Sequence, residues 1–138
     1  MGIKRHWGSA ENIVVQTSDE NGNPINPLVN HNKDYTHVLK ITMNIKRNLA
    51  TDDDDEYLQK SLEMLDGNVT QNNGVSLDQT NHIFTLSMSD NGTWDSIPLP
   101  TEDTDYSLTL NIDVGFERLI EVPLNDRKIT ITPDTNRE

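Results

Sequence analysis

Five consecutive acidic residues are the densest group of potential metal ligands in this sequence of 138 residues. They are Asp52, Asp53, Asp54, Asp55 and Glu56. Alternating carboxylates suit a hard cation such as Ca²⁺, but an EF-hand loop that starts at Asp52 needs glycine at its sixth position, where this chain has Tyr57. Acidic side chains also stabilise the first turn of a helix, because they interact with the positive end of its dipole. We therefore predict a solvated helix start, no metal site and no cofactor, with cation binding by this run as the alternative.

The other residue types used in catalysis lack the spacing of a catalytic site. Cysteine is absent, and the four histidines lie far apart in the sequence: His6, His31, His37 and His82. Carboxylate pairs for glycoside hydrolysis can be drawn from a larger set: Asp90, Asp95, Glu102 and Asp103. Such pairs arise by chance in a chain this acidic, and Trp94, which could stack on a sugar, more often fills the end of a sandwich core. We therefore expect that the protein is not an enzyme.

Four residues near the N-terminus have a composition that folding alone does not explain: Lys4, Arg5, His6 and Trp7. They lie in residues 1–10, which have no apolar periodicity and contain two glycines, so we predict a mobile N-terminal arm. Cations and an exposed indole add no stability to a mobile arm, whereas a docking segment gains an aromatic anchor and charge complementarity. We predict that these four residues bind a partner; a disordered start without such a role is the alternative.

Two alternating stretches must form the framework that positions any site. In residues 106–114 and in residues 39–46, apolar side chains alternate with polar ones, which is the period of a strand that buries one face. The apolar members are Tyr106, Leu108, Leu110, Ile112 and Val114 in the first stretch, and Leu39, Ile41, Met43 and Ile45 in the second. Two such strands predict a β-sandwich or barrel, with the first stretch as its central strand.

Shorter patterns predict the remaining elements. Residues 13–17 favour a first or edge strand, and further short strands are expected around Val75, after His82 and at Ile129. Apolar residues recur at helical spacing at Tyr57, Leu58, Leu62 and Leu65, and Gly67 offers a stop, which predicts a helix near residues 55–66. We therefore predict an all-β, antiparallel sandwich of about seven or eight strands with one short helical insertion.

The turn after the first expected strand is similar to a known module. The stretch VVQTSDENGNPI, with Asp19, Gly22, Asn23 and Pro24, resembles the opening of immunoglobulin-like modules in bacterial surface adhesins and tailed-phage virion proteins. The resemblance covers about a tenth of the chain, and Pro27 departs from it, because those modules resume a strand directly after the first proline. It implies an immunoglobulin-like fold and transfers no site residue.

Length and charge limit the classes of function. A chain of 138 residues with 33% apolar content is expected to form one domain over residues 11–133, with the N-terminal arm before it and a loose tail over residues 134–138. The formal net charge of −12 argues against a nucleic-acid ligand, and no apolar run is long enough to cross a bilayer. We expect a chain without a secretion signal to stay soluble in the cytoplasm.

These features predict a non-enzymatic structural module, most concretely a tailed-phage virion component that decorates a capsid or joins tail parts. It would be assembled in the host cytoplasm in many copies, docking through its N-terminal arm to other virion proteins or to further copies of itself. The charge division supports head-to-tail contact, since residues 1–47 carry six basic and four acidic residues, and residues 48–138 carry five and nineteen. The alternative is an acidic inhibitor or immunity protein that blocks a basic surface, because residues 48–113 carry fourteen acids and one lysine.

Overall fold

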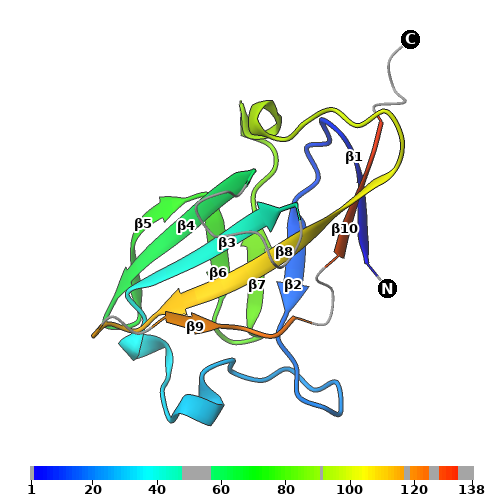
Figure 1. The fold of residues 1–138 in the computed structure, drawn as a ribbon. Coiled ribbons are helices and arrows are strands. Elements are labelled where there is room, and N and C mark those ends of the chain that lie inside the picture. Colours follow the sequence, from blue (N-terminus) through cyan, green and yellow to red (C-terminus); the bar gives the residue numbers. More distant parts are fainter. Residues whose placement is uncertain (1, 48–56, 91, 117–118, 125–127, 134–138) are drawn as a thin grey trace.

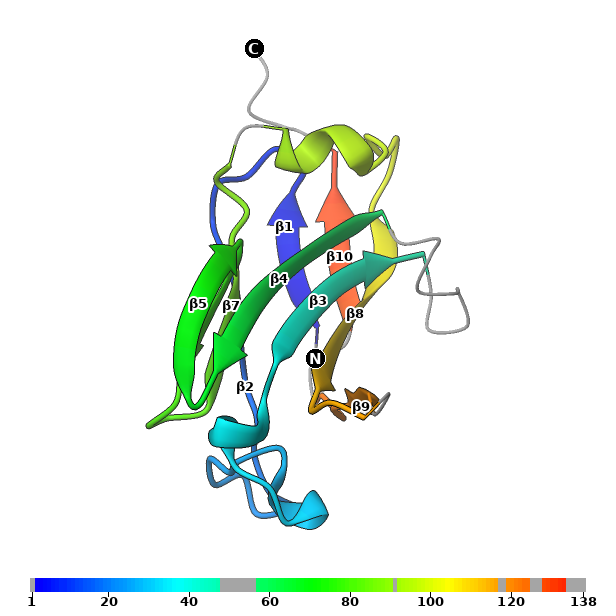
Figure 2. The same ribbon diagram turned by 90° about the vertical axis from the view of Figure 1, so that its left-hand side faces the viewer.

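The protein is an all-β, two-layer sandwich in a computed structural model (Figures 1 and 2). The model describes residues 2–47, 57–90, 92–116, 119–124 and 128–133, to which the structural statements below refer. The strands are β1 (Ile3–His6), β2 (Ile13–Gln16), β3 (Lys40–Lys46), β4 (Leu58–Leu65), β5 (Asn68–Asn73), β6 (Val75–Asp78), β7 (Ile83–Leu86), β8 (Thr104–Asp113), β9 (Leu119–Glu121) and β10 (Lys128–Thr132). Three 3₁₀ turns accompany them: η1 (Val29–His31), η2 (Tyr35–His37) and η4 (Thr93–Ser96).

The larger sheet has the strand order β1-β10-β8-β3-β4-β5, with β9 also paired to β8, and the smaller sheet has the order β2-β7-β6. The larger sheet is strongly curved, and the smaller sheet packs against one of its faces (Figures 1 and 2). Neighbouring strands are antiparallel except β1 and β10, where Ile3 pairs with Ile129 in a parallel ladder. The described residues contain no helix that could span a bilayer.

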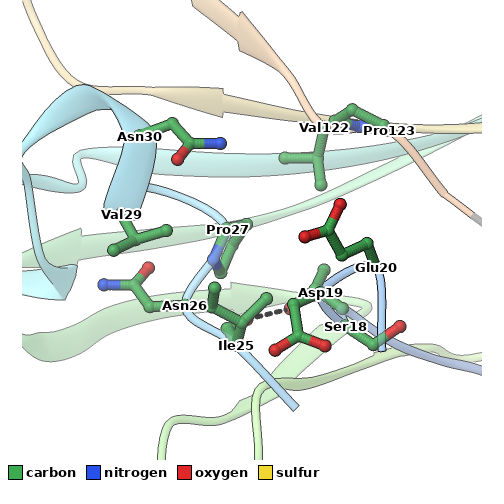
Figure 3. A pocket seen from close by; sticks show the side chains of 11 residues that line it. Ser18, Asp19, Glu20, Ile25, Asn26, Pro27, Val29, Asn30, Val122 and Pro123 are labelled. Carbon is green, nitrogen blue, oxygen red and sulfur yellow. Dashed lines mark hydrogen bonds between the residues drawn. The ribbon is translucent and has the colours of Figure 1, made fainter. Parts of the chain in front are cut away.

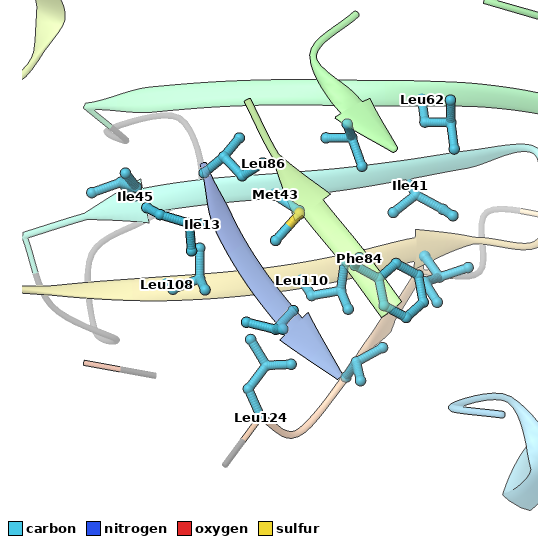
Figure 4. Packing of buried hydrophobic residues seen from close by; sticks show 14 of the residues in the cluster. Ile13, Ile41, Met43, Ile45, Leu62, Phe84, Leu86, Leu108, Leu110 and Leu124 are labelled. Atoms are coloured by element: carbon cyan, nitrogen blue, oxygen red, sulfur yellow. The ribbon is translucent and has the colours of Figure 1, made fainter. Parts of the chain in front are cut away.

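Strand β8 is the central strand of the larger sheet, as its alternation predicts. Leu108, Leu110 and Ile112 are completely buried on the face that meets the smaller sheet. Side chains beside them on β3 and opposite them on β2 and β7 complete one continuous core. They are Ile41, Met43 and Ile45 on β3, Ile13 on β2, and Phe84 and Leu86 on β7 (Figure 4). Leu39, which the same pattern placed in this wall, precedes β3 and is 43% exposed, so that part of the prediction is wrong.

The opposite face of the two central strands is polar, and part of it is also buried. Asn44 on β3 lies across from Thr109 on β8, and its amide nitrogen donates to the Thr109 hydroxyl over 3.3 Å. Asn111 is equally buried on this face. A strand exposed on one side was predicted from the same alternation, but Asn44, Thr109 and Asn111 are buried, and the Asn44 Oδ1 atom has no hydrogen-bond partner among the described residues. The sequence period therefore indicates which face each residue takes and not how deeply that face is covered.

The helix predicted near residues 55–66 is wrong, because residues 58–65 form strand β4, paired with β3 and β5. Leu58 and Leu62 are four positions apart, a spacing that places two side chains on one face in a helix and in a strand alike. Lys60 lies between them on the inward face, and its charge hides the period of two. Leu65, which the helical pattern counted as apolar face, is exposed. The five consecutive acids lie outside the described residues.

The mobile arm predicted for residues 1–10 is also wrong over the described part of that segment. Residues 3–6 form β1 at the edge of the larger sheet, in register with residues 129–132 of β10. Exposure alternates along β1, with Ile3 and Arg5 half-buried. Four residues are too few to show a period, and no local signal points to a partner strand at the other end of the chain. The tail at residues 134–138 lies outside the described residues.

Candidate functional site

Arg5, predicted to bind a partner, instead joins the two strands at the beginning of its own chain. Its guanidinium donates to the carbonyl oxygens of Asn12 at 2.8 Å, Lys4 at 2.9 Å and Glu11 at 3.4 Å. The carboxylate of Glu11 lies 3.7 Å from the Arg5 Nε atom. These contacts hold together the two ends of the segment that leads from β1 in the larger sheet to β2 in the smaller sheet. Arg5 therefore has an internal role at this crossing.

Trp7 and Trp94 tie the N-terminal segment to the end of the sandwich. The Trp7 indole Nε1 donates to the Ile97 carbonyl oxygen at 2.8 Å, and the Trp94 Nε1 donates to the Ser9 carbonyl oxygen at 2.9 Å. The two rings lie 5.8 Å apart between centroids, and Trp7 packs against the core as a partly buried side chain. Trp94 is buried on η4, which agrees with a Trp that fills the sandwich end. Trp7 is thus held by its own domain.

Lys4 and His6 are the two predicted partner-binding residues that β1 leaves exposed. The Lys4 Nζ atom lies 3.9 Å from an Asp103 carboxylate oxygen, a distant pair between two exposed side chains. The His6 Nδ1 atom lies 2.6 Å from the Thr132 hydroxyl on β10. The structure therefore brings three of the four predicted residues together on β1, with Trp7 directly after it, and leaves Lys4 and His6 exposed while Arg5 and Trp7 are partly buried. Partner binding by Lys4 and His6 stays a prediction.

The two ends of the larger sheet are edge strands, β1 and β5. All six side chains of β5 are exposed, and none of them carries a charge. The ladder with β4 shifts register between Glu63 and Met64, which leaves Thr70 as the extra residue of a β-bulge. An edge strand presents a row of unpaired backbone N–H and C=O groups that can pair with another chain, and a bulge limits such pairing.

Lys60 and Gly74 form a polar junction between the two sheets. The Lys60 side chain is 11% exposed, and its Nζ atom lies 3.1 Å from an Asp90 carboxylate oxygen. The same ammonium donates to the Ser87 carbonyl oxygen at 2.7 Å and to the Thr93 hydroxyl at 3.0 Å. Gly74 joins β5 to β6 with a φ of +105°, and a Cβ atom there would clash with the aliphatic part of the Lys60 side chain. Glycine at this position therefore leaves room for the Lys60 side chain to cross from one sheet to the other.

We predict that Lys60→Met lowers the free energy of unfolding by about 1.5 to 3 kcal/mol, because the ammonium group and its hydrogen bonds are lost while the aliphatic stem is kept. Chemical denaturation measures this change. Exposed Lys40→Met on β3 is the matched control and should change stability by less than about 0.5 kcal/mol. Equal stability of Lys60→Met and the parent chain would contradict the structural role of the junction.

An open pocket of about 480 Å³ lies between the turn after β2 and the end of β9 (Figure 3). Its apolar lining comes from Ile25, Pro27, Val29, Val122 and Pro123. Asp19 and Glu20 supply carboxylates at its rim, but Asp19 already accepts hydrogen bonds of 2.9 Å from the backbone of Asn21 and Asn23. The pocket therefore combines apolar walls with a polar remainder, which also includes Thr17, Ser18, Asn26 and Asn30. Sequence analysis missed it, because its walls come from two segments far apart in the chain.

A second, polar depression of about 430 Å³ lies where β5, β6 and β7 meet. Its lining consists of Asn12, Asn72, Asn73, Gly74, Ser76, Thr85, Ser87 and Asp90. Several of these groups have partners of their own: Asn12 Oδ1 accepts from the Met88 amide at 3.0 Å, and Asn72 Oδ1 accepts from the Gly74 amide at 2.9 Å. These bonds shape turns and strand ends.

Titratable groups near the smaller sheet are engaged in local structure. The Tyr35 hydroxyl lies 2.7 Å from His82 Nδ1, and burial, with a smaller effect of the Asp78 charge, raises the pKa of Tyr35 to about 12. Hydrogen bonds from Asn81 lower the pKa of Asp78, and hydrogen bonds from Thr36 lower the pKa of Asp34. Burial also raises the pKa of Tyr106. Within the described ranges, no three His, Asp or Glu side chains gather as metal ligands.

Phe116 is a feature that sequence analysis did not single out. It follows Gly115 in the turn after β8, both residues have positive φ, and the Phe116 side chain is fully exposed. Glycine followed by an aromatic residue directly after a strand was the available signal.

Comparison of the chain with protein-family models, curated proteins and solved structures found no match.

Proposed function

We propose that the protein is a non-enzymatic structural module of a multi-copy assembly, most concretely a tailed-phage virion component that decorates a capsid or joins tail parts. We further propose that its sandwich is of the immunoglobulin-like kind, as the resemblance around Asp19 and Pro24 implies. The observation that supports a joining role best is the pair of open edges, β1 and β5, at the ends of one curved sheet. A module with two such edges can contact one neighbour on each side.

Strand β1 is the better suited of these edges for a protein partner. It is short and carries Lys4 and His6 on its exposed side. An extended segment of a partner could add to the edge through main-chain hydrogen bonds, while acidic side chains of that partner meet Lys4. The strongly acidic remainder of another copy, or an acidic surface of a different virion protein, provides the matching charge. This docking mode replaces the mobile arm as the proposed means of attachment.

Association with assembled particles tests the proposal. We predict that the tagged protein sediments with purified particles and remains in the particle fraction after a second gradient. An unrelated acidic protein of similar size, expressed at the same level, is the control. Detection of the protein only as a free species, with no large assembly containing it, would refute the virion role.

An acidic inhibitor of a basic surface is the second candidate. It is supported by the many exposed carboxylates on the loops that follow β4, β7 and η4, among them Asp66, Asp90 and Glu102. Salt separates the two candidates. Binding of an electrostatic inhibitor to a basic partner weakens steeply as ionic strength rises, because exposed charges are screened beyond about 8 Å at physiological ionic strength. A joint made mainly by backbone pairing loses only the contribution of exposed charges such as Lys4, so its affinity falls much less.

A further inference from the structure

The β8–β9 tip, formed by Gly115 and Phe116, holds an aromatic ring in solvent. Phe116 has φ +55 and a fully exposed side chain. A bulky residue rarely adopts a positive φ, and it persists there only where its surroundings fix the backbone. Here the Asp113 carboxylate accepts a hydrogen bond of 2.8 Å from the Gly115 amide. A strained backbone that exposes a large apolar side chain points to a contact outside the domain.

The same chain carries a pocket whose two apolar walls can receive such a ring. The pocket of about 480 Å³ described above has Val29 and Pro27 on one wall and Val122 and Pro123 on the other (Figure 3). A cavity of about 150 Å³ is sufficient for a benzene ring. Val29 is itself about half exposed, so the apolar wall is open to an entering side chain. The pocket is therefore large enough for a phenylalanine side chain, and its two apolar walls suit one, while the rest of its lining is polar.

Phe116 cannot fill the pocket of its own molecule while the fold is intact. Strand β9 separates the two, since it starts after the tip and ends directly before Val122 (Figure 1). Its residues 119–121 are paired with residues 111–113 of β8. Bringing the ring to its own pocket would break this ladder. The ring and the pocket are thus two complementary surfaces at opposite ends of β9.

We propose that Phe116 of one copy inserts into the Val29–Val122 pocket of a second copy, which makes a head-to-tail contact between identical chains. A contact of this type uses different surfaces on the two copies and can repeat, so that it generates a ring or a filament. Leu119 and Leu39, exposed beside the tip, would be covered at the rim of the same contact. The inference rests on the proposed multi-copy assembly and names one of its joints.

The net charge of −12 opposes contact between copies, and this gives the joint a characteristic response to salt. Added salt screens the repulsion between the acidic bodies but leaves the buried apolar contact intact. We therefore expect self-association to strengthen from low to physiological ionic strength. A joint that depends on ion pairs would show the reverse response, which would contradict an apolar insertion.

Sedimentation velocity over a concentration series tests the contact with the full chain. Phe116→Ala should raise the concentration needed for association at least about tenfold, as expected for a buried aromatic anchor. Val29→Glu should have a similar effect, because it places a charge in the pocket. Leu99→Ala, a truncation of another exposed apolar residue, is the matched control and should associate like the parent chain. A parent chain that stays monomeric, or a Phe116→Ala variant that associates normally, would overturn the inference.

Mixing the two variants gives the sharpest result. Phe116→Ala retains the pocket and Val29→Glu retains the ring, so together they should form pairs with one copy of each variant and no longer species. Failure to form these pairs, or growth beyond them, would contradict the head-to-tail contact. Pairing of two β5 edges would be insensitive to both substitutions and would also refute it. Particle association in the absence of self-association would leave the proposed virion role standing and remove only this joint.

Discussion

Replacement of Leu110 by alanine is expected to lower the free energy of unfolding by about 2 to 5 kcal/mol. Leu110 is completely buried in the middle of β8, and its partner across the ladder is Met43 on β3. Side chains of the smaller sheet cover it from the other side (Figure 4). The ladders on both edges of β8 hold the backbone in place, so the site cannot collapse to fill the lost volume. Chemical denaturation of the two proteins measures the difference.

The control for this prediction is Leu119→Ala on β9, an exposed position on the neighbouring strand. Its effect should stay within about 0.5 kcal/mol, because little apolar area is lost from the interior. If Leu110→Ala unfolded at the same denaturant concentration as the parent chain, the assignment of β8 as the central core strand would be wrong.

Trp7→Ala is expected to destabilise the isolated domain by about 2 to 4 kcal/mol, less than a fully buried Trp because the ring is only partly covered. The substitution removes the ring packed beside Trp94 and the hydrogen bond to the Ile97 carbonyl. Trp7→Phe keeps an aromatic ring and loses only the hydrogen bond, so it should cost about 1 kcal/mol. Denaturation of all three proteins, each without any partner, provides the measurement.

The Trp7 series also distinguishes two roles of the N-terminal segment. A structural role predicts that stability falls in the isolated domain and that Trp7→Phe restores most of it. If Trp7→Ala instead kept the stability of the parent chain and failed only to enter particles, Trp7 would be a docking anchor, as its sequence context first indicated. The structural role appears in denaturation of the isolated domain, and the docking role appears in the particle-association assay.

The framework of the fold could be predicted because its two central strands alternate over many residues. Leu108, Leu110 and Ile112 on β8, with Ile41 and Met43 on β3, leave no alternative to a strand that buries this face. Strand β4 could not be predicted in the same way, since the spacing of Leu58 and Leu62 fits a helix and a strand equally. The inward position of Lys60 is explained by Asp90, which pairs with its ammonium group, and by Gly74, which leaves room for its side chain, and both are distant from it in the sequence.

Partner binding by the N-terminal segment stays a prediction, and the contacts of its side chains depend on the fold. The unusual composition of Lys4, Arg5, His6 and Trp7 singled out this segment, and in the structure its first three members lie on the edge strand β1. The carbonyl groups that Arg5 binds and the Ile97 carbonyl that Trp7 binds carry no sequence signal, because every residue has such a group. Which side chains are engaged and which remain exposed therefore required the fold.

The parallel pairing of β1 with β10 has a consequence for how the chain is completed during synthesis. His6 and the Thr132 side chain that it contacts are 126 residues apart, so β1 leaves the ribosome well before β10 and must wait for the intervening chain before its partner strand exists. Contacts this distant in sequence are slow to form, because a long loop must close. In this interval β1 can also meet the finished β10 of a neighbouring nascent chain, which is the route to domain swapping. Where several ribosomes translate one message, strand exchange thus competes with closure of β1 onto its own sheet.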